Sequence, residues 1–245
     1  GLNSPFLYLV GVLHPEDWEM ILSGNLSASS RQVFTKSIEI ILRYGTPHTQ
    51  LAALETVERL SRERIAAAGR AARAIGMPVV PTLVAFLRKP RNRRMTFEVV
   101  HALRAIRYAP GNAGGQLEID SRAERHVLRW ILGEIGSVYR DADIWWRYYE
   151  ESGRKEIVSG LAILESALRE RTLRVAEWAL DVTVLLDKEG LITWGRRDLD
   201  MREYAHRLDM IEILESLGSH RIGAMTVPLL KFESWERVAR SGKSF

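Results

Sequence analysis

The sequence predicts an all-α protein built as a right-handed superhelix of stacked helical hairpins. Apolar residues recur every three or four positions along most of the chain, as at Phe34, Ile38, Ile41 and Leu42. Similar helix endings return about 30 residues apart, and short breaks follow them. Repeats of this length that hold two helices each are typical of helical solenoids.

The repeated endings lie at 41–45, 72–76, 103–107 and 132–136. Glycine adopts a left-handed conformation after a helix at little cost, so we expect helices to stop at Gly45, Gly76 and Gly136. A loop at 110–115 should precede a helix that is capped by Asp120 or Ser121 and ends near Tyr139.

We expect a single domain over 1–245, with regular repeats at 29–140 and a looser helical half at 141–245. Two short β-branched runs, 182–184 and 191–193, lie among helical patterns without hairpin turns, which argues against a sheet. The first residue is Gly1 and the chain stops after 241–245 without an obvious cap, so we expect a piece of a longer protein.

Composition excludes several classes of protein. The 245 residues are 46% hydrophobic and contain no Cys, which excludes a disulfide scaffold, cysteine-bound zinc, a thiol nucleophile and an iron–sulfur cluster. The longest stretches without charged residues, 1–15 and 75–87, are shorter than the ~20 apolar residues of a membrane-spanning helix. No secretory signal is recognisable. We therefore expect a soluble, cytoplasmic chain.

Residues 66–76, followed by Pro78 and Pro81, resemble a HEAT repeat, in which a Leu/Ile-x-x-Leu/Ile-Gly ending precedes a proline early in the next helix. Over about 31–240, the order of the segments is similar to the soluble HEAT region of bacterial carriers related to ATP/ADP translocases and the major facilitator superfamily. That resemblance implies a transporter part and often a cyclic-nucleotide-binding domain outside this chain, with this region at the inner face of the membrane. The insertion at 194–202 departs from the pattern.

Positive charge gathers in the middle of the chain. The segment from Arg59 to Arg107 contains twelve basic residues and only two acidic ones, although the net charge of the whole chain is only +4. The densest part is a predicted inter-helix loop, whose candidate binding residues are Arg88, Lys89, Arg91, Arg93 and Arg94. The loop could be simply solvated, or it could hold an acidic partner, an anionic membrane surface or nucleic acid. Few aromatic residues for base stacking lie nearby.

A second candidate contact region is the aromatic cluster Trp145, Trp146, Tyr148 and Tyr149. Adjacent residues on a helix point about 100° apart, so these four side chains cannot all face one core. At least one of them should lie at the surface, where aromatic residues favour protein interfaces. The alternative is packing between repeats.

The sequence contains two motifs that bear on metal or cofactor binding, and each departs from a functional site. Two Glu-x-x-His pairs, Glu98/His101 and Glu203/His206, could contribute to a di-iron centre, but His101 adjoins an apolar position typical of a core edge. Residues 241–244 lack the first glycine of a phosphate-binding loop, and no Gly-x-Ser-x-Gly elbow is present. We predict no metal, cofactor or small-molecule substrate.

The function expected from these observations is a non-enzymatic scaffold that docks a protein partner. The resemblance to the carriers implies that it is the soluble regulatory part of a membrane carrier. The alternative is a nucleic-acid-binding protein that uses the basic segment 59–107, including the HEAT-like DNA-glycosylase type. A di-metal enzyme is a third hypothesis.

Overall fold

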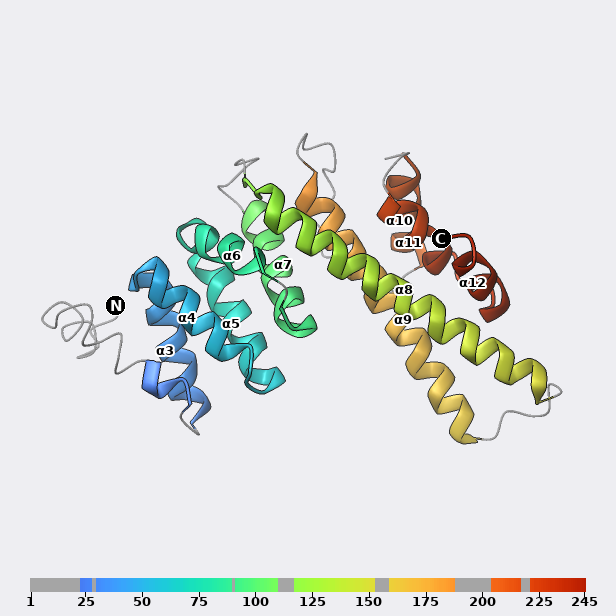
Figure 1. Ribbon diagram of the computed structural model, residues 1–245, viewed down its shortest axis with the longest axis horizontal. Helices are drawn as coiled ribbons and strands as arrows, with labels where there is room; N and C mark the ends of the chain where they lie inside the picture. Colours follow the sequence, from blue (N-terminus) through green and yellow to red (C-terminus); the bar gives the residue numbers. More distant parts are fainter. Residues whose placement is uncertain are drawn as a thin grey trace, which may run out of the picture. The chain divides into compact units, whose positions relative to one another are not determined.

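The computed structural model describes residues 23–27, 30–89, 91–109, 117–152, 159–187, 204–216 and 221–245 (Figure 1). Helices dominate these ranges and no strand occurs in them, which confirms the all-α prediction. Contacts between residues divide the chain into two compact units, Gly1–His126 and Val127–Phe245. The single domain over 1–245, with a looser half at 141–245, stays a prediction.

Unit 1 consists of two layers of short helices. In chain order they are α3 (Arg31–Tyr44), α4 (Pro47–Val57), α5 (Arg62–Ile75), the 3₁₀ turn η1 (Met77–Val79), α6 (Val80–Leu87) and α7 (Arg93–Arg107). Helix α5 packs between α3 and α7, and the three lie side by side in Figure 1. Helices α4 and α6 pack on each other as the second layer.

The three helices of the first layer repeat with a constant period. They begin at Arg31, Arg62 and Arg93, which are 31 residues apart, and each follows a capping residue, Ser30, Ser61 or Asn92. The Ser30 and Asn92 side chains accept a hydrogen bond from the third backbone N–H of their helices, which satisfies one orphan donor. The period of about 30 residues expected from the sequence is therefore present in the folded chain.

Helix ends in unit 1 agree with the expected stops. Helix α3 ends before Gly45 and α5 ends before Gly76. Gly76 has φ 79°, a conformation that favours glycine, and the chain turns there into η1. Helix α7 ends at Arg107, where the third repeated ending was found.

The core of unit 1 depends on the small side chains of α5. Large apolar residues such as Phe34, Ile38 and Leu103 are fully buried on the neighbouring helices. The residues of α5 that are buried are mostly alanine or glycine: Ala67, Ala68, Gly69, Ala71 and Ala72. Small residues allow α3 and α7 to approach α5 closely, so that the large side chains of these neighbours fill the space.

One buried amide connects the two layers. The Gln50 side chain of α4 donates through Nε2 to the Leu42 carbonyl of α3 at 2.9 Å, and its Oε1 accepts from the Thr82 hydroxyl of α6. Gln50 and Thr82 are both buried. Because buried polar groups are costly unless they are paired, this bridge fixes how α3, α4 and α6 meet.

Helix α8 (Ser121–Glu151) begins in unit 1 and continues in unit 2. Asp120 caps it, as expected, by accepting from the backbone N–H groups of Arg122 and Ala123 at 3.0 Å. The stop expected at Gly136 and the end expected near Tyr139 are wrong, because α8 runs without a break through both glycines of the repeated ending. Glycine within a helix costs only about 1 kcal/mol, and buried apolar residues on both sides of Gly136 hold the helix.

Unit 2 also contains α9 (Ser159–Leu186), α10 (Tyr204–Ser216), α11 (Arg221–Leu230) and α12 (Trp235–Gly242). The β-branched run 182–184 lies inside α9, as expected for a chain without a sheet there; the run 191–193 and the insertion 194–202 lie outside the described residues. Helix α11 packs on α9, α10 and α12, and the Tyr139 hydroxyl of α8 donates to the Met225 carbonyl of α11 at 2.7 Å.

In the described part of the chain, no single helix combines the length and apolar character that crossing a membrane requires. Only α5 together with the η1–α6 segment meets that test, as a pair bent by 118°. Both members of the pair contribute to the core of unit 1.

We expect the substitution Gln50→Leu to lower the free energy of unfolding by about 1–3 kcal/mol, because it leaves the Leu42 carbonyl and the Thr82 hydroxyl without their partner. Urea titration followed by circular dichroism measures this loss. The double variant Gln50→Leu/Thr82→Val should recover part of the loss, since it also removes the unpaired hydroxyl. Equal stability of wild type and Gln50→Leu would contradict the proposed bridge.

Candidate functional site

The predicted basic loop between α6 and α7 contains one largely buried arginine and four exposed cations. The buried one is Arg91: its side chain is only 11% exposed and contacts Glu55 at 2.6 Å and Glu58 at 3.4 Å. Its guanidinium also lies over the Phe86 ring, 4.2 Å from the centroid, and donates to the Phe86 carbonyl. Arg91 therefore joins the loop to α4, and we leave it out of the contact surface.

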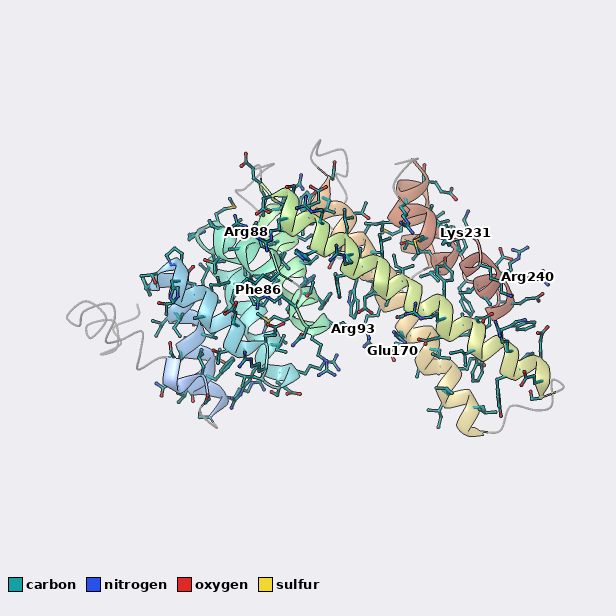
Figure 2. The ribbon with its side chains drawn as sticks, viewed as in Figure 1. Phe86, Arg88, Arg93, Glu170, Lys231 and Arg240 are labelled. Carbon is teal, nitrogen blue, oxygen red and sulfur yellow. The ribbon has the colours of Figure 1, made fainter. Side chains whose placement is uncertain are left out.

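Arg88 also has an internal partner, because its Nε donates to the Asp120 carboxylate at 2.8 Å. The hydrogen bond from Arg88, together with the backbone N–H of Ala123, lowers the pKa of Asp120. Lys89, Arg93 and Arg94 have exposed side chains. Figure 2 labels Phe86, Arg88 and Arg93, which lie along this connection between α6 and α7.

Each of the three helices of the first layer begins with an arginine. Arg31, Arg62 and Arg93 are each exposed and each occupy the first position of a helix; we call these three residues the arginine edge. The pKa of the Glu63 carboxyl is lowered by its own backbone N–H and the Ser61 hydroxyl, and also by the charges of Arg62 and Arg31. The effect of Arg31 on Glu63 agrees with the first turns of α3 and α5 lying near each other.

A half-buried carboxylate lies between α5 and α7. Glu98 of α7 packs over Gly69 of α5. A Cβ atom added at Gly69 would overlap with Oε2 of Glu98 and would lie 3.2 Å from the Cβ of Glu98. Its side chain is 17% exposed, and Oε2 is 3.7 Å from Nη1 of Arg73. We call Gly69, Arg70, Arg73, Glu98 and His101 the α5–α7 seam.

The electrostatics of the α5–α7 seam are unusual for this chain. Burial raises the pKa of Glu98, although Arg73, His101, Arg70 and Arg62 all act to lower it. Burial also lowers the pKa of Arg73, while Glu98 opposes that shift. The Nη1 atom of Arg73 is buried and makes no hydrogen bond, since 3.7 Å is too long for one. Arg73 and Glu98 therefore attract each other electrostatically without forming a hydrogen bond through Nη1.

The aromatic cluster of α8 is divided between core and surface. Trp145 is buried, with 6% of its surface exposed, whereas Tyr148 is 50% exposed. Trp146 and Tyr149 are partly buried and their rings lie 5.8 Å apart. At least one of the four aromatic residues reaches the surface, as expected. Trp145 faces inward, so Tyr148 is the member best placed for a partner.

Of the two Glu-x-x-His pairs that the sequence offered as metal ligands, the structure describes only the first. In the first pair, the His101 ring stacks on Phe97 at 5.6 Å, and Glu98 points to Gly69 and Arg73. The second pair, Glu203/His206, lies outside the described side chains. Among the residues that the structure does describe, no group of three or more His, Asp or Glu side chains could hold a metal ion.

The basic segment can be recognised in the sequence, but its arrangement in space cannot. The arginine edge could have been found by aligning the chain on its 31-residue period, because Arg31, Arg62 and Arg93 then coincide. The α5–α7 seam gave no such signal, because residues 29 positions apart, Gly69 and Glu98, meet only in the packed layer.

No protein-family model matches this sequence, and no curated protein or solved structure is detectably similar to it.

We expect Arg91→Met to lower the free energy of unfolding by about 2–4 kcal/mol, because Glu58 is left half-buried without its cation and the loop loses its link to α4. Chemical denaturation measures the change. The matched control is Arg94→Met, three residues further along and exposed, which should cost less than about 0.5 kcal/mol. Similar losses for the two variants would contradict the structural role of Arg91.

Glu98→Gln should become more stable relative to the wild type as pH rises from about 4 to 7. A carboxyl whose folded-state pKa is raised stabilises the fold below its unfolded pKa, and this contribution is lost as pH rises through the folded value. Glutamine stays neutral throughout, so it does not lose that contribution. Thermal unfolding of both proteins across this range tests the sign.

The matched control for this experiment is Glu170→Gln on the exposed surface of α9, labelled in Figure 2. A wild type that gains stability over Glu98→Gln with rising pH would show that the Glu98 carboxylate is favoured in its charged form.

Proposed function

We propose that unit 1 is a HEAT-like helical repeat, wound as a right-handed superhelix, that acts as a non-enzymatic scaffold and binds an acidic segment of a protein partner. The contact surface is the arginine edge, extended by Arg94 and by the exposed Arg70 of α5. The observation that carries the proposal is the arginine at the first position of all three helices in one layer.

Arginine at that position is electrostatically unfavourable for the isolated protein. The first turn of a helix carries a partial positive charge, so acidic residues are favoured there and basic ones are not. Neither α3 nor α7 has an acidic residue in its first turn, and α5 has only Glu63. Three helix starts and three cations at one edge produce a field that attracts an anionic partner.

Several features favour an acidic protein segment over nucleic acid. The Phe97 ring is stacked with His101, and Tyr108 lies near the Arg107 guanidinium, so neither offers an open platform for a base. Arg88 and Arg91, at the centre of the basic loop, are engaged with carboxylates of this chain. An acidic partner would repeat this pairing of arginine with carboxylate at the arginine edge.

The triple variant Arg31→Gln/Arg62→Gln/Arg93→Gln should bind polyglutamate at least about tenfold more weakly than wild type. Its melting temperature should stay equal or rise slightly, since the cations are removed from the positive ends of the helices. Isothermal titration calorimetry and thermal unfolding give the two results. The matched control is Arg125→Gln/Arg129→Gln/Arg140→Gln, which removes the same charge from exposed positions of α8.

Equal weakening in both triple variants would show that net charge, not the arginine edge, governs binding. Wild-type protein that binds oligothymidine but not polyglutamate would overturn the proposal in favour of nucleic-acid binding through the segment 59–107.

A further inference from the structure

We propose that a carboxylate of the acidic partner binds Arg70 and Arg73 at the α5–α7 seam and that Glu98 takes up a proton when it does. This inference rests on the proposed function, because it assigns the chemistry of the same basic surface. It identifies the ligand group as a carboxylate and makes its binding dependent on pH.

The geometry of the seam keeps Glu98 close to the arginines. Gly69 leaves room for the carboxylate against α5, and the Glu98 Oε2 lies 3.7 Å from Arg73. Arg70 lies one turn before Arg73, is exposed, and its charge acts on both Arg73 and Glu98. A carboxylate that approaches Arg70 and the exposed part of Arg73 therefore arrives beside Glu98.

Arg73 has a hydrogen-bond donor, Nη1, that has no acceptor among the described residues. Its side chain is 28% exposed and its buried Nη1 makes no hydrogen bond, so its attraction to Glu98 is purely electrostatic. A guanidinium binds a carboxylate best through two parallel N–H···O bonds. Turning toward an incoming carboxylate would replace a long ion pair by hydrogen bonds.

Proton uptake follows from the balance of charges around Glu98. The groups that face it are Arg62, Arg70 and Arg73 from α5 and His101 from its own helix, and together they offset part of the cost of burying its charge. A bound anion neutralises the arginines and removes water, so both changes disfavour ionised Glu98. The proton comes from solvent and binds a Glu98 carboxylate oxygen, and the resulting O–H can donate to the partner's carboxylate.

Calorimetric titration of the whole chain with polyglutamate tests this inference, in two buffers of different ionisation enthalpy between pH 5.5 and 7.5. Wild type should take up about half a proton or more per site in excess of Glu98→Gln. Its affinity should rise at lower pH by at least about threefold more than that of the variant. Because protonation of the polymer is common to both proteins, it cancels in the comparison.

Two further variants test the position of the Glu98 carboxylate and the charge of Arg70 separately. Gly69→Ala keeps the carboxylate but forces it out of the seam, so the excess proton uptake should fall while binding persists. Arg70→Gln should weaken binding of polyglutamate at every pH. Retained binding with equal proton uptake in wild type and Glu98→Gln overturns the inference but leaves the proposed function in place. Failure of wild type to bind polyglutamate at any pH overturns both.

Discussion

Unit 1 is held together by the close packing of α5 between α3 and α7. Large side chains on the two neighbouring helices, such as Phe34 and Leu103, are completely buried, while all but one of the buried residues of α5 are alanine or glycine. A bulky residue at those positions would separate the three helices, and with them the row of helix starts. Small side chains on the central helix therefore allow the three helices to pack closely.

The same packing creates the unusual electrostatics of the α5–α7 seam. Glu98 is half-buried because Gly69 lets its carboxylate approach the α5 backbone, and burial penalises its charge despite the arginines nearby. A pair of opposite charges in such a place gives little net stability, because desolvation offsets most of the attraction. Groups whose pKa is shifted by burial and by specific charged neighbours are concentrated at functional sites of proteins.

Basic residues in this chain serve two different purposes. Arg91 and Arg88 join helices that are distant in sequence by meeting the carboxylates of Glu55, Glu58 and Asp120. Arg31, Arg62 and Arg93 are exposed at helix starts, where the helix dipole disfavours a cation. Counting positive charge along the sequence therefore overstates the charge that a partner could reach and conceals where it is concentrated.

Local patterns of apolar residues and glycine were enough to predict the all-α class, the period near 30 residues and the helix stops at Gly45 and Gly76. Tertiary packing carries α8 through Gly136, since buried apolar residues on both sides outweigh a small local preference. It also decided that Arg91 turns inward and that Glu98 meets Gly69 and Arg73. Those contacts join residues about 25 to 36 positions apart, and no local pattern specifies them.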